Sequence, residues 1–208
     1  IRLDSPLLGN DDLTRLKNLD RDGFSPIVLS TNYNAGRGGD NLAAALDSIF
    51  TAADQAIADG VNIIILSDRS PKPGQSPIPA LLVTAGLHHH LVVQKTRTLA
   101  SIIVESAEPR EVHHFALLVG YGASAVNPYL ALAAISDMIH CGLIKNTEND
   151  KAQSNYLKAA VKGLVKIISK MGISTVQSYQ GAQVFEAVGL SQDLVDRYFT
   201  ATSSRIGG

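Results

Sequence analysis

The chain has 208 residues, of which 45% are hydrophobic and 18% are charged, and its net charge at pH 7 is −1. This length suits one domain of about 100 to 200 residues, and the composition excludes an intrinsically disordered protein. A net charge so close to zero provides no general attraction to nucleic acid or to an anionic membrane surface, so we expect neither as a partner.

The apolar runs are far shorter than the roughly 20 residues of a membrane-spanning helix, and the N-terminus does not resemble a signal peptide. The single cysteine, Cys141, excludes an internal disulfide bond and cannot alone hold zinc or an iron–sulfur cluster. We therefore expect a protein of the cytoplasm or of an organelle stroma, such as the plastid stroma. The start without methionine and the end soon after a helical pattern suggest a piece of a longer polypeptide, with terminal processing as the alternative.

The first half of the chain alternates short β-branched runs with longer segments of helical period, which is typical of βα units and a parallel sheet. Strands are expected at residues 26–31 and 61–67, and the second is so apolar that it belongs in the middle of the sheet. Helices are expected at residues 42–59, before Gly60, and at 79–93, after a loop rich in proline and glycine.

The second half continues this pattern with strands at residues 99–105, 123–127 and 173–178. Helices are expected at 110–122, 128–139, 155–170, 182–188 and 192–199, and residues 142–154 are expected to form a polar surface segment. Five strands are too few for a closed eight-stranded barrel. We therefore predict one α/β domain over residues 1–208, with parallel βα units that form an open or incomplete TIM-barrel-like structure. Residues 1–25 would be a lead-in segment and residues 190–208 an exit helix and linker.

Polar residues follow most of the predicted strands. Because the carboxyl ends of parallel strands meet at one edge, these residues would form a common rim there. Either ligand binding or structural hydrogen bonding could explain them. The candidate rim residues are Asn32, Asn34, Asp68, Arg69, Glu105, Ser106, Asn127, Ser178, Tyr179 and Gln183.

Two glycine-rich segments could bind a nucleotide or an anion. Residues 120–125 (GYGASA) match the GxGxxA form of a dinucleotide fingerprint, but a predicted helix precedes them where that motif needs a strand. We interpret them as a helix stop and a turn. Residues 34–40 (NAGRGGD) precede a helix but lack the Gly-Lys-Ser/Thr ending of a phosphate-binding loop. We interpret them as a flexible loop.

The histidines and the cysteine give no clear metal or nucleophile pattern. His88, His89 and His90 are consecutive, so on a helix they point about 100° apart and cannot converge on one metal. The pair His113 and His114 has the same defect. Cys141 follows His140 directly, and adjacent residues on a helix point in different directions, so the imidazole would not reach the sulfur to lower its pKa. We therefore interpret Cys141 as a buried structural cysteine rather than a nucleophile.

Four lysines recur every fourth residue along the predicted helix at 155–170. Such a stripe is either a solvated helix face or a docking surface for an acidic partner, and we favour the solvated face. The stripe consists of Lys158, Lys162, Lys166 and Lys170.

Several longer segments resemble the glutamate synthase large-subunit family, in one register over nearly the whole chain. They are LSDR (66–69), LHHHL (87–91), REVHHFALL (110–118) through NPY (127–129), SKMGIST (169–175), and SYQGAQ (178–183) with FEA (185–187). Each segment alone is weak, whereas together they are specific to the central domain of that family.

The resemblance implies an amidotransferase domain, which releases ammonia from glutamine at a terminal cysteine, and a synthase domain. The synthase domain joins ammonia to 2-oxoglutarate and reduces the product with electrons passed through an iron–sulfur cluster and FMN. The central domain would lie between them, resemble the FMN barrel without binding FMN, and help form the ammonia tunnel. This chain begins at an isoleucine and has one cysteine, so neither half-reaction is expected here, and we assign no catalytic, cofactor-binding or metal-binding residue.

Three functions follow from these patterns. The first, which we favour, is a scaffold and tunnel domain of glutamate synthase. The second is a stand-alone barrel-like enzyme or small-molecule binder that uses Asp68, Arg69, Glu105 and Asn127. The third is an interaction module that docks through the lysine stripe, which would make its binding sensitive to salt.

Overall fold

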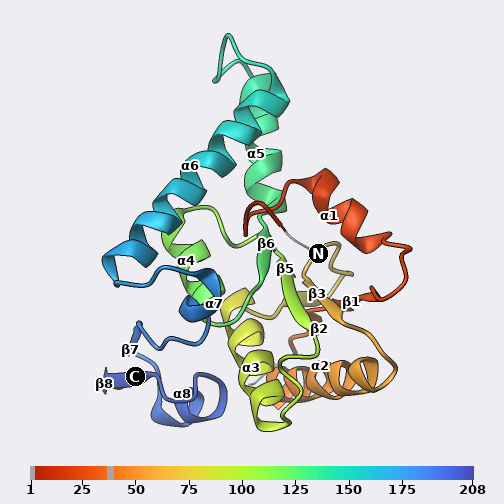
Figure 1. Ribbon diagram of the computed structural model, residues 1–208, viewed down its shortest axis with the longest axis vertical. Coiled ribbons are helices and arrows are strands. Elements are labelled where there is room, and N and C mark those ends of the chain that lie inside the picture. Colours follow the sequence, from red (N-terminus) through yellow and green to blue (C-terminus); the bar gives the residue numbers. More distant parts are fainter. Residues whose placement is uncertain (1–2, 37–39) are drawn as a thin grey trace.

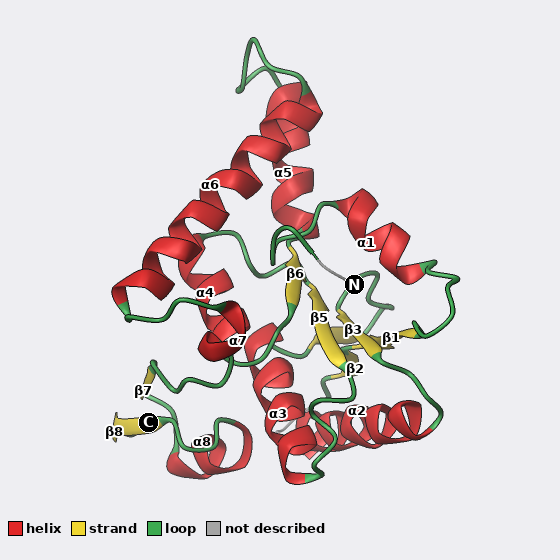
Figure 2. Cartoon of the chain, in the orientation of Figure 1, coloured by secondary structure: helices red, strands yellow, loops and turns green. Residues whose placement is uncertain are grey.

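A four-stranded parallel sheet forms the centre of the molecule in the computed structural model, which describes residues 3–36 and 40–208 (Figure 2). Its strands lie in the order β1 (Pro26–Ser30), β3 (Ile63–Ser67), β5 (Ser101–Glu105) and β6 (Ala125–Asn127). The register places Ser30 beside Ser67, Ser67 beside Glu105, and Glu105 beside Asn127. The carboxyl ends of the four strands are therefore level, as the parallel βα units predicted.

Three helices cover one face of this sheet. They are α2 (Asp40–Ala58), α3 (Ala80–Val93) and α4 (Val112–Gly120). Their buried side chains share one core with every second residue of the strands, because successive strand residues point to opposite faces. All five residues of β3 are buried, which confirms that this strand lies inside the sheet.

The opposite face, which we call the inner face, is covered in part by α1 (Asn10–Lys17) (Figure 1). Leu8, Leu13 and Leu16 pack there against strand residues of the other parity, namely Ile63, Ile65, Ile103 and Ala125. The preceding residues pair with the edge strand β6, since Leu8 N donates to Val126 O at 2.9 Å and Val126 N donates to Pro6 O at 2.8 Å. The lead-in segment thus covers a face and an edge that would otherwise expose apolar and backbone groups.

The predicted strand at residues 173–178 is wrong. Residues 173–175 have no regular structure, and α7 (Val176–Tyr179) follows them. The Thr175 side chain caps α7, because its oxygen accepts a hydrogen bond from Ser178 N at 3.2 Å. A run of β-branched residues here therefore starts a helix instead of extending the sheet.

The predicted helix at 182–188 is also wrong. Residues 182–185 are irregular, and β7 (Glu186–Val188) then pairs with β8 (Ser203–Ile206) in a separate two-stranded sheet. The helix between them, α8 (Gln192–Tyr198), agrees with the prediction. The expected exit linker is thus partly a strand. A further small sheet joins β2 (Asn32–Asn34) to β4 (Gln75–Pro77).

Two long helices, α5 (Tyr129–His140) and α6 (Asn149–Lys170), form a hairpin that projects from the body (Figure 1). Part of the polar segment expected at 142–154 is therefore helical. Cys141 caps α5 near the tip of the hairpin and is exposed, so the prediction that it is buried is wrong. The four lysines of the stripe are exposed on α6, as both a solvated face and a docking surface require. Across residues 3–36 and 40–208, no helix is both long and apolar enough to cross a membrane.

Candidate functional site: the carboxyl end of the sheet

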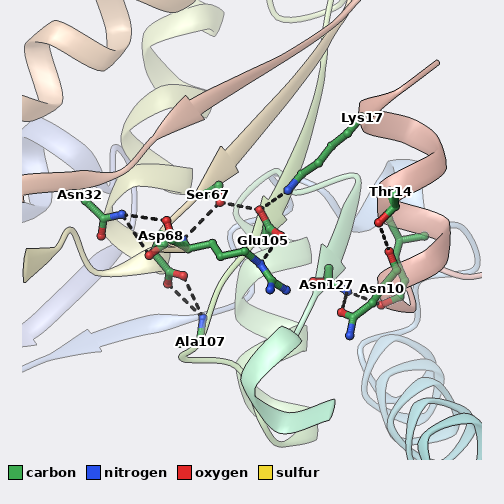
Figure 3. Close-up of polar contacts among 11 residues, drawn as sticks. Asn10, Thr14, Lys17, Asn32, Ser67, Asp68, Glu105, Ala107 and Asn127 are labelled. Carbon is green, nitrogen blue, oxygen red and sulfur yellow. Dashed lines mark hydrogen bonds and ion pairs between the residues drawn. The ribbon is translucent and has the colours of Figure 1, made fainter. Parts of the chain in front are cut away.

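Glu105, the last residue of β5, is the centre of a charged network at the carboxyl end of the sheet (Figure 3). Its side chain is only 2% exposed. Oε2 accepts hydrogen bonds from Lys17 Nζ, at 2.6 Å, and from Ser67 Oγ. Oε1 accepts from Arg69 Nε at 2.8 Å. Two cations from different segments therefore share one buried carboxylate.

These contacts control the ionisation of Glu105. Burial alone would raise its pKa, because a carboxylate is less stable away from water. The hydrogen bonds from Lys17, Ser67 and Arg69, together with the charge of Lys17, outweigh burial and lower the pKa below the ordinary value of 4.5. Glu105 is thus held as a carboxylate and is poorly suited to act as a general acid near neutral pH.

Asp68 makes a second set of contacts beside this one. Its Oδ2 accepts hydrogen bonds from Ser106 Oγ at 2.6 Å and from Ala107 N at 3.0 Å. Ser106 Oγ in turn accepts from Glu108 N at 3.1 Å. The Asp68 carboxylate therefore fixes the turn that follows β5, which is a structural task.

Asn127, at the end of β6, ties the sheet to the lead-in segment. Its Nδ2 donates to Leu8 O at 3.0 Å and to Asn10 Oδ1 at 3.1 Å. On the other side of the rim, Asn32 Nδ2 donates to Asp68 O at 3.0 Å. The Oδ1 atoms of Asn32 and Asn127 are buried and have no hydrogen-bond partner among the described residues. These two neutral amide oxygens are acceptors only and cannot transfer protons.

Tyr129, the first residue of α5, packs against Arg69 at the rim. The Arg69 guanidinium carbon lies 4.2 Å from the centre of the Tyr129 ring, which is a cation–π contact. Burial, followed by the neighbouring Asp68 carboxylate, raises the pKa of Tyr129 to about 12. The phenol therefore stays protonated and is not a base near neutral pH.

The structure brings together most of the predicted rim but not all of it. Asn32, Asp68, Arg69, Glu105, Ser106 and Asn127 lie at the carboxyl end of the sheet as expected. Asn34 does not join them, and its carbonyl oxygen accepts instead from Asn41 Nδ2 at 3.2 Å.

Three predicted rim residues lie elsewhere, because residues 173–178 do not form the strand that we expected there. Ser178 and Tyr179 lie on α7, next to Gln180, whose Nε2 donates to Ala123 O, just before β6. That position is at the amino end of the sheet, opposite the rim. Tyr179 is buried there and donates to Ala116 O at 3.0 Å. Gln183 is exposed in the irregular segment after α7.

Sequence reasoning missed four members of the network, namely Lys17, Asn10, Ser67 and Tyr129. Lys17 and Asn10 lie on α1, in the segment read only as a lead-in. A signal was present, because Leu13 and Leu16 of that segment have the spacing of one helix face and Asp11 and Asp12 suit a first helical turn. Tyr129 comes two residues after the end of the strand predicted at 123–127, so its place near a strand end could have been inferred.

The alternative motifs have structural roles. α4 ends at Gly120, and Gly122 has φ +113° against the His88 ring, where a Cβ would clash, so residues 120–125 are a helix stop and turn as predicted. Residues 37–39 of the glycine-rich loop lie outside the described residues.

The histidines form pairwise contacts with acidic side chains. His90 contacts Asp54 at 2.8 Å, and His114 contacts Glu111 at 3.1 Å. Within the described ranges, no three histidine, cysteine or acidic side chains form a metal-binding group.

The rim does not fit a flavin. A flavin at the end of a barrel needs open space on the inner face and free donors for its ring and phosphate. Here Leu13 and Leu16 of α1 cover part of that face, and Lys17 and Arg69 are engaged by Glu105. Cys141, at the far tip of the helical hairpin, is the only cysteine in the sequence and cannot by itself hold an iron–sulfur cluster.

Comparison with known proteins identifies close relatives. The family described as "Glutamate synthase central domain" matches residues 1–191. The large chain of NADPH glutamate synthase of Bacillus subtilis is 46% identical over 208 residues, which are 100% of this chain and 13% of that protein. A ferredoxin-dependent glutamate synthase of Arabidopsis thaliana is 42% identical over 99% of this chain and 13% of that protein. NADH glutamate synthase of Saccharomyces cerevisiae is 39% identical over 99% of this chain and 10% of that protein.

Among solved structures, a mutant flavocytochrome b2 with benzoylformate matches with a TM-score of 0.50 and 12% identity. The match covers 69% of this chain and 39% of that one. At this identity the likeness shows the fold alone, and it agrees with the predicted incomplete TIM-barrel-like architecture. The chain spans only about a tenth of the curated relatives it matches.

Proposed function

The chain belongs to the glutamate synthase central domain family, and from this membership we propose that it is the scaffold domain of a glutamate synthase large subunit. In this role it links the glutamine amidotransferase and FMN-binding synthase domains of one polypeptide and forms part of the ammonia tunnel between them. The parent enzyme makes glutamate from glutamine and 2-oxoglutarate, in the cytoplasm or in a plastid stroma. FMN and the iron–sulfur cluster belong to other parts of that polypeptide.

One observation carries the proposal: the charged groups at the carboxyl end of the sheet are bonded to one another. In parallel α/β folds this edge is the usual place for ligands and reacting groups. Here Glu105 engages Lys17 and Arg69, and Asp68 engages Ser106 and Ala107. Such a network holds α1 and the strand-end turns in place, and it favours a structural role over a catalytic one.

The test uses the full-length polypeptide with Glu105→Gln, and with Glu186→Gln as the matched control. Glu186 forms an exposed ion pair with Arg205, so its loss should have little effect. We expect Glu105→Gln to reduce glutamate formation from glutamine and to release free ammonia into the medium. Glutamate formation from added ammonium and 2-oxoglutarate should change much less, because the synthase domain is intact.

Two results would contradict the proposal. An equal and nearly complete loss of the glutamine-dependent and ammonium-dependent reactions would place Glu105 in the chemistry. Full coupling without ammonia release, in a variant whose central domain is measurably destabilised, would remove the tunnel role.

A further inference from the structure

A groove of about 720 Å³ opens at the amino end of the sheet, opposite the paired rim. Part of its wall is the inner face of the sheet, at Ile63 and Ile103, and Leu16 and Phe24 from the lead-in segment also line it. Ser101 and Ser124, at or just before the starts of β5 and β6, add hydroxyl groups. The lining is therefore partly apolar and partly hydrogen-bonding, which is the usual character of a small-molecule site.

Arg97 is the only charged residue among the described residues that line this groove. It is half-buried, and its guanidinium contacts only neutral acceptors. Nε donates to His88 Nδ1 at 2.9 Å, one terminal nitrogen donates to Ala100 O at 2.8 Å, and the other donates to Gly122 O at 2.8 Å. Three of the five N–H donors of the guanidinium are thus used, and two are left.

No carboxylate balances this cation. Within residues 3–36 and 40–208, no Asp or Glu oxygen forms an ion pair with Arg97, and none of the residues outside those ranges is acidic. Burial lowers the pKa of Arg97, but a guanidinium remains protonated in proteins. Burial and then the charge of Arg97 lower the pKa of His88 to about 4, so His88 is a neutral acceptor. The lining of the groove therefore carries an uncompensated positive charge.

The surrounding side chains leave hydrogen-bonding capacity for a ligand. Within the part of the chain that the structure describes, the side chains of Ser101, Ser124 and Gln177 make no hydrogen bond, although all three line the groove. Asn62 and Gln180 are instead engaged with backbone groups. A bound anion could therefore accept from Arg97 and from a serine hydroxyl together.

We propose that this groove binds an organic carboxylate, with its carboxylate on Arg97 and its apolar part against Leu16, Phe24 and Ile103. A planar guanidinium matches the two oxygens of a carboxylate, and one cation balances one such charge. A phosphate dianion would need further cations, which the described lining does not provide. The carboxylate comes either from a free small molecule or from an Asp or Glu side chain elsewhere in the parent polypeptide. The second source rests on the proposed function, whereas the groove and its Arg97 do not.

The first experiment titrates the 208-residue chain with sodium butyrate and follows the NMR signal of the Arg97 Nε–H group. Sodium chloride at the same ionic strength is the reference for unspecific anion binding. We expect a saturable shift with butyrate, and affinity weaker by about tenfold or more in Arg97→Gln, since a charge-assisted hydrogen bond is lost. Arg15→Gln is the matched control, because it removes the same charge from an exposed ion pair and should bind butyrate normally.

The wild-type titration is decisive even if Arg97→Gln fails to fold. An Arg97 signal that does not move, or that moves equally with chloride, overturns the proposal, as does normal butyrate binding by a folded Arg97→Gln variant. Calorimetry on the full-length polypeptide, compared with its Arg97→Gln variant, then separates the two sources. Butyrate binding that needs Arg97 in both proteins indicates a free carboxylate ligand. Such binding only in the 208-residue chain indicates that a carboxylate of the polypeptide already fills the groove.

Discussion

The two ends of the central sheet use charge in opposite ways. At the carboxyl end, the buried Glu105 carboxylate is bonded to Lys17 and Arg69, so the charges are paired within the chain. At the amino end, the Arg97 guanidinium meets only a neutral imidazole and backbone carbonyls. The end that holds ligands in most parallel α/β proteins is thus closed here, while the opposite end keeps an unbalanced charge beside a groove.

The difference arises from the lead-in segment. Both α1 and residues 6–8 lie against the inner face and the β6 edge, and α1 brings Lys17 to Glu105. At the amino end, α7 lies beside the start of β6, because Gln180 Nε2 donates to Ala123 O, but α7 has no charged side chain to pair with Arg97. Among the strand-end polar residues, Glu105 and Asn127 therefore attach α1, whereas Asp68 and Asn32 bond to the turns that follow the strands.

The largest expected effect on stability comes from the Glu105 network at the carboxyl end of the sheet. Glu105→Gln removes the charge that holds Lys17 and Arg69 and should lower the free energy of unfolding by about 4 kcal/mol, as for other broken buried ion pairs. Urea unfolding followed by circular dichroism measures it. The control Glu186→Gln breaks an exposed pair and should cost less than about 1 kcal/mol. Equal effects of the two variants would show that burial of the network contributes nothing.

The pH dependence of stability separates the two ends. The folded-state pKa of His88 is lowered to about 4 from 6.5, so between these values the unfolded chain binds more protons and stability falls as pH falls. The loss should approach about 3 kcal/mol by pH 4. The pKa of Glu105 is also lowered, so its contribution is lost only below its ordinary value of 4.5.

His88→Gln is the control for this pH effect, since glutamine does not titrate. Unfolding experiments at several pH values should show that the decline between pH 6.5 and 4 is smaller in this variant. A decline of the same size as in the wild type would mean that His88 is not the group responsible.

A third expected effect concerns Gly122, which allows the His88 side chain to pack at the amino end. Gly122→Ala adds a Cβ against the His88 ring at φ +113° and should lower the free energy of unfolding by about 2 kcal/mol. Gly142→Ala is the matched control, because Gly142 also has positive φ but open space around it. If thermal unfolding shows equal losses, backbone conformation alone explains the effect and contact with His88 does not.

The smallest expected effect on stability comes from weakening the attachment of α1 to the sheet. Lys17→Met removes one of the two cations on Glu105 while keeping the aliphatic stem, and should cost about 1.5 kcal/mol. Hydrogen exchange should accelerate in α1 and residues 6–8 more than in β3 and β5. Uniform acceleration over the sheet would show that α1 does not open as a separate unit.

Much of the fold was predictable, and the failures have physical causes. The strands β1, β3, β5 and β6 follow from apolar runs, because a parallel sheet covered on both faces requires them. The strand prediction for residues 173–178 was wrong because their β-branched side chains suit a strand, whereas Thr175 caps a helix at that point. Local propensity could not distinguish the two, since the outcome depends on packing against α4 and on the Gly181 N to Gly120 O bond.

The candidate site was predictable in its strand-end half only. Asp68, Arg69, Glu105 and Asn127 could be placed by topology, because the level carboxyl ends of parallel strands bring them together. Their partners on α1 lie roughly 90 to 120 residues away in sequence. Which distant segment covers a sheet face is decided by tertiary packing, so the identity of Lys17 and Asn10 as partners could not be derived from local patterns.

A structural role for the carboxyl end of the sheet is tested by assaying the 208-residue chain for glutamate formation from glutamine and 2-oxoglutarate, with FMN and a reductant supplied. An absorbance spectrum of the repurified chain measures bound flavin at the same time. We expect no turnover and no stoichiometric flavin, because the groups at the carboxyl end are engaged with one another. Turnover, or one flavin per chain that is lost in Glu105→Gln, would contradict this expectation and make the rim an active site.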